Sequence, residues 1–495
     1  MTDQDLFSTA TAGLSEVSAP QLVRLADGDR YGLTIGPVRK ELGGDLRMLA
    51  YNGSIPGPTL HVPQGSRITV DVRNDGDVET TVHWHGLRLE NRFDGVPHET
   101  QEPIPIGGGY SCQVQFPDAG FYWYHPHMRE DFAQEMGLYG TIVVEPTDPE
   151  YWPAVDRELT LTLDDLLVEE GHIAAFRRSG PNFTAMGRFG NVLLINGEPT
   201  FAGTATAGEV LRLYLVNTAN TRLFNVALRG ARMKLVGGDS GRYERETFVD
   251  EVLLAPSERA VVDVLFDAPG EVRLEHRTPD RVYDLGVFTV APATSGSSAA
   301  AGSYDALRTD PELTAERRLI GHDLDREPDK VLAFVSRMSM SMEDMPMGDM
   351  PMEPGDGLEW EDHMLEMNRA SDPSNMIWQL VDRETGAVNG AIDWAFAVGD
   401  RVKIRLVNEM DQDHPMHHPF HVHGAGRFLV LSRDGAPEPN LVWKDTVLLR
   451  AGETIDILLD VSNPGLWMAH CHIAEHTESG MMFSFSVARR PEPVR

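Results

Sequence analysis

The chain has 495 residues, 41% of them hydrophobic, and is therefore long enough to form about three domains with buried cores. Its formal net charge is −33, with 76 acidic against 43 basic residues, which argues against nucleic acid or an anionic membrane surface as a partner. The simpler role for this charge is an acidic surface that favours solubility or salt tolerance.

Cysteine content and apolar runs set further limits. Cys112 and Cys471 are the only cysteines, so the chain can form at most one disulfide. The first 25 residues contain no apolar run of signal-peptide length, and no later run approaches the ~18 residues that a membrane-spanning helix needs. We therefore expect a soluble protein, periplasmic or secreted if a leader has been removed and cytoplasmic otherwise.

Two strand patterns each occur three times along the chain. In the first, Gly is followed nine residues later by Asn with alternating apolar positions between them, which predicts half-buried strands at 65–74, 208–217 and 399–408. In the second, an apolar strand follows a Gly, at 119–127, 269–277 and 463–472. The same landmarks in the same order predict one domain type repeated three times.

The whole sequence is rich in short alternating strands with Gly, Pro and Asn between them, which predicts an all-β fold of sandwiches or Greek-key barrels. We place the domains at 1–147, 148–292 and 331–495, with a linker at 293–330. The second boundary falls in a run of small residues, 291–303, that is typical of a linker.

Histidines cluster only in the first and last thirds, as four pairs of the form His-x-His. On a strand the two members of a pair face the same side about 7 Å apart, so they can bind two neighbouring metal ions. Four pairs at matching repeat positions predict a metal cluster at a domain interface. His172 and His276 of the middle third stand alone, and we expect surface or core roles for them. The pairs are His83/His85, His125/His127, His421/His423 and His470/His472.

Between His470 and His472, Cys471 points to the opposite face of its strand and must serve a different metal. His476 and Met481 follow Cys471 at five-residue steps. Together with a second imidazole from a distant strand, they predict a His₂Cys site with a weak axial Met, which is typical of blue copper. Four-coordinate zinc sites rarely use Met.

The second imidazole is sought in "HPMHHPFHVHG" (414–424), which holds five histidines in eleven residues. The frame His-Pro-x-His-x-His fits 418–423 and assigns His418 to the blue copper. A frame that begins at His414 would place Pro419 where an imidazole is required. His414 and His417 stay unassigned, with a structural or substrate-side role.

Four motifs, "HWHG", "WYHPHM", "HPFHVHG" and "HCHIAEHTESGMM", resemble those of the multicopper oxidases, the family of laccases, cuprous oxidases and bilirubin oxidases. The resemblance covers nearly the whole chain. It implies three cupredoxin-like Greek-key β-barrel domains and four copper ions. The implied type 1 ligands are His418, Cys471, His476 and Met481. The implied type 2 ligands are His83 and His421, and the implied type 3 ligands are His85, His125, His127, His423, His470 and His472.

The resemblance implies an oxidoreductase that takes electrons one at a time from a donor and reduces O₂ to water. The expected donors are Cu(I) or phenolic compounds, with cuprous oxidation ranked above general phenol oxidation. One alternative is a catalytically silent copper-binding or assembly protein on the same fold, which the intact ligand set argues against. A two-domain copper nitrite reductase would not need the type 3 ligands of "HCH".

In this arrangement Cys471 connects the two sites, because its sulfur binds one copper while its two sequence neighbours bind the others. Water formation also consumes protons, so carboxylates are needed near the cluster. Asp94, in "FDGVP", matches an acidic position that the family uses as a relay, although an Asp-Gly turn explains it equally well. Related bacterial enzymes often carry Glu directly after the last type 1 His, where this chain has Thr477. We expect Glu478 to substitute, with Glu475 as the alternative.

One segment departs from ordinary laccases, "MSMSMEDMPMGDMPM" (338–352), in which seven of fifteen residues are Met. Soft thioethers prefer Cu(I), and bacterial cuprous oxidases carry similar insertions over the type 1 site. The alternatives are a Met-lined core strand at its start and a disordered loop without special function beyond. The predicted substrate-side residues are Met416, Met338, Met340, Met342, Met345, Met347, Met350 and Met352.

Overall fold

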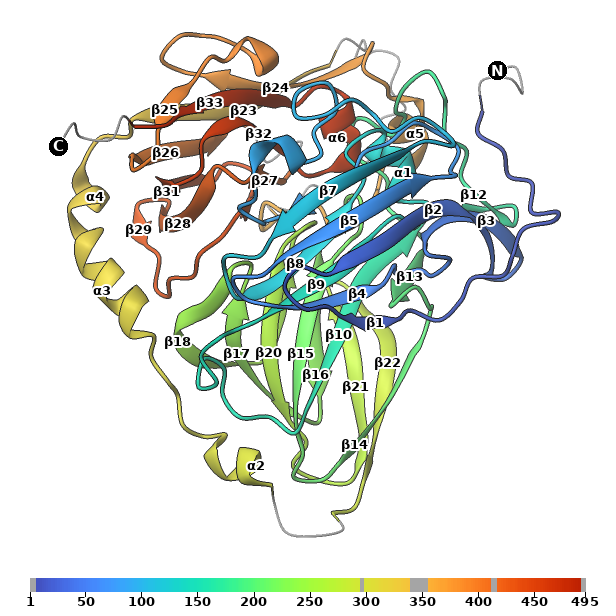
Figure 1. The fold of residues 1–495 in the computed structure, drawn as a ribbon, viewed down its shortest axis with the longest axis vertical. Coiled ribbons are helices and arrows are strands. Elements are labelled where there is room, and N and C mark those ends of the chain that lie inside the picture. Colours follow the sequence, from blue (N-terminus) through green and yellow to red (C-terminus); the bar gives the residue numbers. More distant parts are fainter. Residues whose placement is uncertain (1–5, 294–297, 339–354, 411–415, 491–495) are drawn as a thin grey trace.

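The computed structural model describes residues 6–293, 298–338, 355–410 and 416–490. Three pairs of facing β-sheets follow one another along this part of the chain, coloured blue, green and orange in Figure 1. We call them the first, middle and third domains. The linker between the middle and third domains lies on the outside of the molecule (Figure 1).

The first domain pairs a five-stranded sheet with a four-stranded sheet. The first of these has the order β1 (Leu22–Arg24), β4 (Thr59–Pro63), β9 (Gly140–Glu145), β8 (Gly120–His125) and β6 (His83–His85). The second has the order β3 (Asp45–Tyr51), β2 (Arg30–Glu41), β5 (Arg67–Asn74) and β7 (Gly109–Gln115). The short strand β6 is thus an edge strand, and it carries the first histidine pair.

The middle domain pairs sheets of six and five strands. The larger has the order β13 (Val192–Ile195), β10 (Arg157–Leu166), β15 (Val210–Asn217), β20 (Arg259–Leu265), β17 (Arg232–Gly238) and β18 (Gly241–Val249). The smaller has the order β14 (Phe201–Thr206), β22 (Val282–Ala291), β21 (Gly270–Arg277), β16 (Phe224–Arg229) and β19 (Val252–Leu254). A separate hairpin joins β11 (Val168–Glu169) to β12 (His172–Ile173).

The third domain repeats this arrangement strand for strand. Its six-stranded sheet has the order β24 (Met376–Asp382), β23 (Lys330–Met338), β26 (Arg401–Asn408), β31 (Thr454–Val461), β28 (Gly426–Arg433) and β29 (Ala436–Pro437). Its five-stranded sheet has the order β25 (Ala395–Ala397), β33 (Met482–Ala488), β32 (Gly465–Cys471), β27 (His418–Val422) and β30 (Thr446–Leu449). A short helix, α5 (Leu365–Ala370), precedes β24.

The three strands predicted from the Gly-to-Asn pattern are present as β5, β15 and β26. The prediction that each would be half-buried was wrong for β15, which is buried at every position. Leu211, Leu213 and Leu215 face the core of the middle domain, whereas Tyr214 and Val216 pack into the core of the first domain. A sheet covered on both faces has no polar side, so the alternating apolar pattern of β15 did not indicate which of its side chains are exposed.

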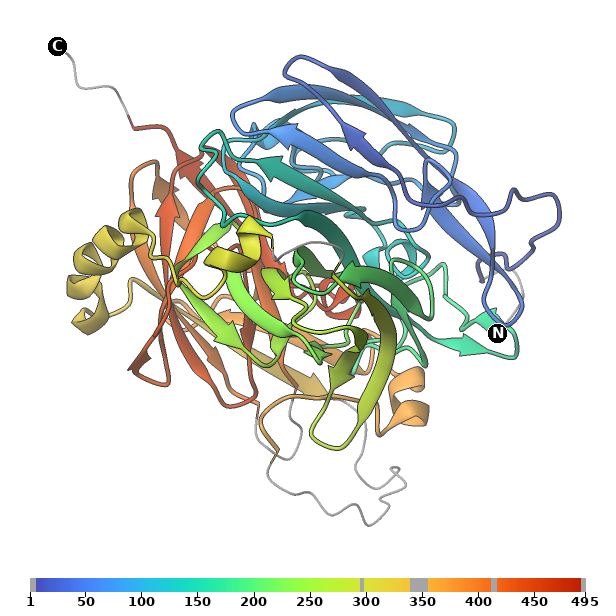
Figure 2. The ribbon, with the colours of Figure 1, turned by 90° about the horizontal axis from the view of Figure 1, so that it is seen from below.

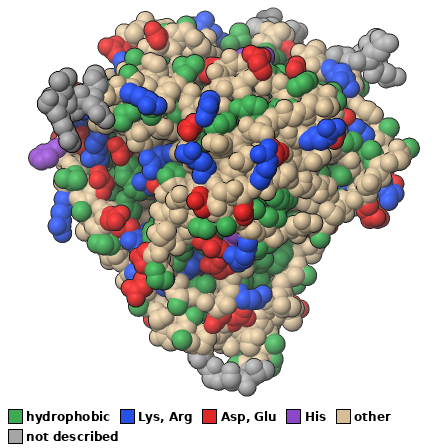
Figure 3. Space-filling model, in the orientation of Figure 1, with side chains coloured by type: hydrophobic (Ala, Val, Ile, Leu, Met, Phe, Trp, Pro, Cys, Tyr) green, Lys and Arg blue, Asp and Glu red, His purple; other side chains and the backbone are tan. Residues whose placement is uncertain are grey.

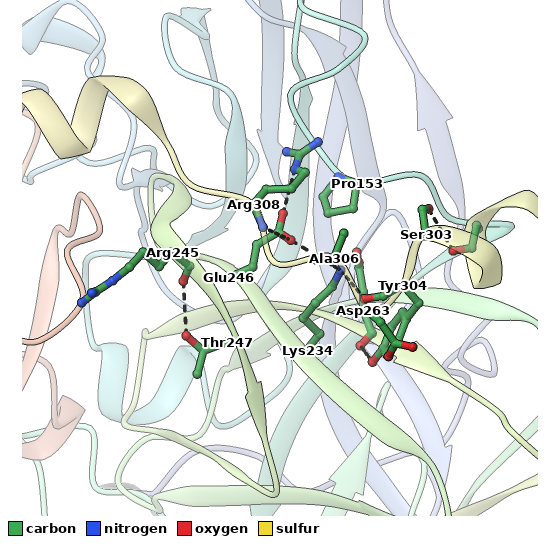
Figure 4. Close-up of polar contacts among 12 residues, drawn as sticks. Pro153, Lys234, Arg245, Glu246, Thr247, Asp263, Ser303, Tyr304, Ala306 and Arg308 are labelled. Carbon is green, nitrogen blue, oxygen red and sulfur yellow. Dashed lines mark hydrogen bonds and ion pairs between the residues drawn. The ribbon is translucent and has the colours of Figure 1, made fainter.

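The linker contains helices, which the small-residue pattern did not predict: α2 (Ala299–Ser303), α3 (Pro311–Leu319) and α4 (Gly321–Asp325). Polar contacts hold the segment after α2 against the middle domain (Figure 4). Lys234 Nζ donates to the carbonyl oxygens of Tyr304 and Ala306 at 3.1 and 3.3 Å, and Arg308 donates to Glu246 at 2.9 Å. In the described ranges, no helix is long and apolar enough to cross a membrane.

Seen from below, the middle domain lies across the first and third domains (Figure 2). Two short helices also join the first and third domains directly, since α1 (Glu130–Ala133) packs against α6 (Ala474–Glu478). The domain junction therefore brings together segments far apart in sequence, and the histidine pairs lie on these segments.

On the face in Figure 3, side chains of both charges are interspersed.

Candidate metal centre

The four histidine pairs meet at the junction of the first and third domains, and all eight rings are buried. Their strands pair in the same register in both domains: His83 lies opposite His125, and His421 lies opposite His470. The two domains also contact each other ring to ring. The His85 and His421 ring centroids are 3.8 Å apart, and those of His83 and His423 are 4.0 Å apart.

Possible metal-binding atoms of these histidines fall into three groups, each with its atoms within 4.8 Å of one another. Two groups of three contain all six residues of the predicted type 3 set. The third joins the predicted type 2 residues to His85, which belongs to two groups. The groups are His85/His125/His472, His127/His423/His470 and His83/His85/His421.

The second group tests whether the residues fit a metal ion. His423 Nε2 lies 3.3 Å from His127 Nε2 and 3.1 Å from His470 Nε2. Each opposite nitrogen already has an oxygen acceptor for its proton: His127 Nδ1 faces Glu130 at 3.1 Å, His423 Nδ1 faces Asp94 at 2.7 Å and His470 Nδ1 faces the Cys471 carbonyl at 2.7 Å. A neutral imidazole carries one proton, so three lone pairs point at one another. A cation between them relieves this repulsion.

Other rings show the same arrangement, with one nitrogen bonded to oxygen and the other buried without a partner among the described residues. His83 Nδ1 donates to the Asp94 carbonyl at 2.7 Å, and His125 Nδ1 donates to the Pro126 carbonyl at 2.8 Å. The nitrogens without partners are His83 Nε2, His85 Nδ1, His125 Nε2 and His421 Nε2. Buried imidazoles held in this way by a second partner are typical of metal ligands.

Electrostatics keep these rings in the neutral form that binds metals. Burial, and next the neighbouring imidazoles, lower the pKa of His85, His125, His127, His421 and His423 well below the ordinary histidine value. Burial lowers the pKa of His470 to about 4. Lone pairs are therefore available at neutral pH.

The predicted blue-copper residues form a separate group. Cys471 Sγ lies 3.4 Å from His418 Nδ1 and 3.7 Å from His476 Nδ1, and all three side chains are buried. Met481 is buried in the same core cluster, and its carbonyl accepts a hydrogen bond from Cys471 N at 3.2 Å. One thiol and two imidazoles, with a methionine bonded through its backbone to the same cysteine, fit copper by their softness and number.

Asp94 is fully buried against the cluster. One carboxylate oxygen accepts the His423 proton, and the other has no hydrogen-bond partner among the described residues, although it lies 3.5 Å from His83 Nδ1. Asp94 is thus both a residue of the Asp-Gly turn and a contact of the histidine cluster. Gly95 has φ +88°, and a Cβ there would lie 2.1 Å from the Val82 carbonyl oxygen, so only glycine fits after Asp94.

The two carboxylates of α6 bond to neighbouring segments of the first and middle domains. Glu478 accepts a hydrogen bond from Glu130 N at 2.9 Å, and Glu475 accepts one from Asn220 Nδ2 at 3.2 Å. Neither has a recorded bond to a cluster histidine. At the position where the resemblance implied Glu, the Thr477 hydroxyl lies 3.2 Å from His470 Nδ1.

Sequence reasoning missed two carboxylates that touch the histidines. Glu130, which is 1% exposed, faces His127 from α1, and its place three residues after His127 is the signal that was available. Asp445 lies 3.0 Å from His85 Nε2, and its carbonyl oxygen accepts a bond from His421 Nδ1 at 2.9 Å. No local pattern marks Asp445, because its partners are more than twenty residues away in sequence.

The substrate-side predictions fall mostly outside the described residues, which holds for His414 and for Met340 to Met352; the side chain of Met338 is likewise not described. Met416 is 3% exposed and packs in the same core cluster as Cys471. His417 is buried, with Nδ1 accepting the Glu359 N–H at 3.3 Å. Cys112 and Cys471 are both free and buried, so the one disulfide allowed by composition is not formed.

Comparison with known proteins gives a consistent result. Three multicopper oxidase family descriptions match residues 37–149, 158–273 and 362–491. The chain is 28% identical to the multicopper oxidase MmcO of Mycobacterium tuberculosis, over 96% of this chain and 89% of that protein. It is 25% identical to copper resistance protein A of Escherichia coli, over 94% of each chain.

Among solved structures, a multicopper oxidase from Pseudomonas thermotolerans aligns with a TM-score of 0.69 and 26% identity, over 95% of this chain and 100% of that one. The predicted all-β fold of cupredoxin-like domains is thereby confirmed. The matched ranges include all four histidine pairs and the Cys471 group. The chain belongs to the multicopper oxidase family, and it is a copper-binding oxidoreductase that uses O₂ and an electron donor.

Proposed function

We propose that the two groups of side chains hold four copper ions. His418, Cys471 and His476 would hold the type 1 ion, with Met481 as a weaker fourth ligand. The eight paired histidines would hold a cluster of three ions. In it the type 2 ion would take His83 and His421, and the type 3 pair would take His85, His125, His127, His423, His470 and His472.

The observation that carries this proposal is the set of three Nε2 atoms of His127, His423 and His470, at 3.1 and 3.3 Å from one another with every Nδ1 committed to oxygen. Such a buried arrangement of lone pairs is favourable only around a cation. Bound copper supplies one-electron oxidation of a donor at the type 1 site and four-electron reduction of O₂ to water at the cluster.

Cys471 links the two sites through the backbone. Its thiol faces His418 and His476, whereas its neighbours His470 and His472 face the cluster from the other side of β32. Burial raises the pKa of the Cys471 thiol, so the thiolate forms only with a metal ion beside it. A few covalent bonds thus separate donor oxidation from oxygen reduction.

Carboxylates supply the protons that water formation needs. We assign the first relay to Asp94, whose free oxygen can hold a proton inside the cluster wall. We assign the second to Glu478, the half-buried residue at the end of α6, whose pKa is raised to about 7 by burial and next by Asp131. A group with that pKa both accepts and releases protons near neutral pH. Glu130 lies between Glu478 and His127.

For the donor, we propose Cu(I), with phenols as the second class. Copper resistance protein A of Escherichia coli is a relative over nearly the whole chain, and its name concerns copper. The segment 338–352 supplies seven thioethers, and Asp344 and Asp349 add charge that attracts a cation. Met416, two residues before His418, is a thioether already packed in the cluster of Cys471.

The test is elemental analysis for copper combined with O₂ uptake, using Cu(I) and a phenol as separate donors. We expect about four copper ions per chain, a blue colour and turnover with both donors. Bound copper without O₂ uptake would establish the silent copper-binding protein instead.

Deletion of 338–352 separates the two donors. We expect Cu(I) oxidation to fall sharply and phenol oxidation to stay unchanged or rise, because every proposed copper ligand lies elsewhere in the chain. The visible spectrum is the control and should not change. Equal loss of both activities with an intact spectrum would contradict a Cu(I) role for the segment and favour a laccase.

A further inference from the structure

His85 is turned the opposite way to the other rings whose contacts are described above. Its Nε2 faces protein oxygens, Asp445 Oδ1 at 3.0 Å and Thr446 Oγ1 at 3.1 Å, whereas its Nδ1 is buried without a partner among the described residues. The other rings bond oxygen through Nδ1. His85 can therefore bind a metal ion only through Nδ1, and something must hold it in this orientation.

His85 is held by two residues of the third domain: Asp445, which lies just before β30, and Thr446, the first residue of β30. Besides binding His85, these residues contact His421: the Asp445 carbonyl and Thr446 Oγ1 lie 2.9 and 3.1 Å from His421 Nδ1. The Thr446 hydroxyl also donates to Asp445 Oδ1 at 2.9 Å. One short segment thus orients a ligand from each of two domains.

Asp445 is 2% exposed, so its charge needs a partner, and the middle domain provides it. Arg259, the first residue of β20, donates to both carboxylate oxygens of Asp445 at 2.7 and 2.5 Å. Its Nε donates to the Phe121 carbonyl of the first domain at 3.1 Å. Arg259 is itself 2% exposed, and it touches all three domains at one point.

The backbone next to His85 is shaped to admit this ion pair. Gly86 follows His85 in "HWHG" and has φ +84°. A Cβ at Gly86 would lie 2.5 Å from Asp445 Oδ2 and 2.8 Å from Arg259 Nη2. Any larger residue would push the ion pair away from His85, so the glycine and the ion pair form one arrangement.

We propose that Arg259 of the middle domain is a positioning residue for the copper cluster: it holds the Asp445 carboxylate, which fixes His85 with Nδ1 toward the metal. The inference rests on the proposed assignment of copper to the eight histidines. It gives the middle domain, which contributes no copper ligand of its own, a direct role in the chemistry of the cluster.

The test is Arg259→Lys, which keeps the positive charge but cannot span two carboxylate oxygens and a carbonyl at once. We expect about 10- to 100-fold weaker copper binding by the cluster, measured by chelator competition with elemental analysis. The blue band of the type 1 site should be unchanged, since Arg259 has no recorded contact with that group.

Arg212→Lys is the matched control. Arg212 is also 2% exposed, lies in the same domain, donates to both oxygens of Asp263 at 2.8 and 3.0 Å, and bonds the Pro153 carbonyl at 2.8 Å. It has no recorded contact with a histidine of the cluster. The melting temperature of the copper-free protein should fall by a similar amount in both variants, while only Arg259→Lys should weaken cluster copper.

The inference would be overturned if both Lys variants keep their cluster copper, and also if both lose it to the same extent. If Arg259→Lys does not fold, Asp445→Asn and its match Asp263→Asn give the same comparison with a neutral side chain of the same shape. A wild-type protein that binds copper only beside Cys471 would instead refute the proposed function, and the inference with it.

Discussion

The middle and third domains carry different side chains at the same points of the same fold. Val226 lies opposite His276 in the middle domain as Phe420 lies opposite Cys471 in the third. This register puts His276 at the position of Cys471. It also puts Phe224 at the position of His418.

Two further positions of the middle domain correspond to positions of the third domain in the same way. Tyr283 pairs with His276 where Met481 bonds Cys471, and Ala227 pairs with Glu275 where His421 pairs with His470. In the middle domain the space is filled by rings, because His276 stacks on Tyr283 at 5.4 Å and lies 5.1 Å from Phe224. Burial does not separate the two places, since His276 and His418 are both fully buried. The two places differ because His418 has a second and a third metal-binding atom within reach, on Cys471 and His476, whereas Phe224 and Tyr283 occupy the space beside His276.

The largest expected effect is that of Cys471→Ser. We expect the blue colour to vanish and turnover to fall to background, because the hard hydroxyl cannot replace the thiolate, while much of the cluster copper stays. Visible spectroscopy, O₂ uptake and elemental analysis measure the three results. A blue Cys471→Ser protein would show that the copper site is elsewhere.

His418→Ala should come next, with loss of the blue band and nearly as large a loss of turnover, since it removes one of three close ligands. His414→Ala should leave the spectrum unchanged. The same spectra measured on both proteins decide the frame of "HPMHHPFHVHG". Reversed outcomes would mean that the frame beginning at His414 is correct.

Asp94→Asn should lower O₂ reduction about 10²- to 10⁴-fold, the range for loss of a group that transfers protons. The amide keeps the shape and an acceptor for His423, so copper content and the blue band should be retained. Steady-state O₂ uptake and copper analysis measure the two. Full activity in this variant would reduce Asp94 to a turn residue.

The smallest expected effect is that of His276→Phe in the middle domain. His276 Nδ1 accepts the Asn225 N–H at 3.0 Å, so the variant should lose about 1–3 kcal/mol of stability and no copper. Thermal unfolding and copper analysis give the two quantities. Any loss of copper would contradict the contrast between the two domains.

The copper ligands were open to prediction because their spacing is imposed by the backbone. Residues two apart on one strand always share a face, so the His-x-His pairs could be assigned to one metal cluster without tertiary structure. For the same reason Cys471, which lies between two histidines, had to face the other way. The repeated Gly landmarks then placed the pairs at matching positions of two domains.

Contacts made across domains were not predictable in this way. Arg259, Asp445 and His85 come from three domains and meet only in the folded chain, and no spacing relates them. The continuous burial of β15 has the same cause, since its outer face is covered by another domain. Glu478 was chosen by proximity in sequence to His476, whereas its hydrogen bond from Glu130 N crosses from the third domain to the first.

Anomalous scattering at the copper absorption edge, measured on crystals of the protein as isolated with copper, tests the central claim most directly. We expect three peaks among the eight histidines at the junction of the first and third domains, and one beside Cys471. We expect none beside His276 and Tyr283. Fewer than three peaks at the junction, or a peak in the middle domain, would contradict the account.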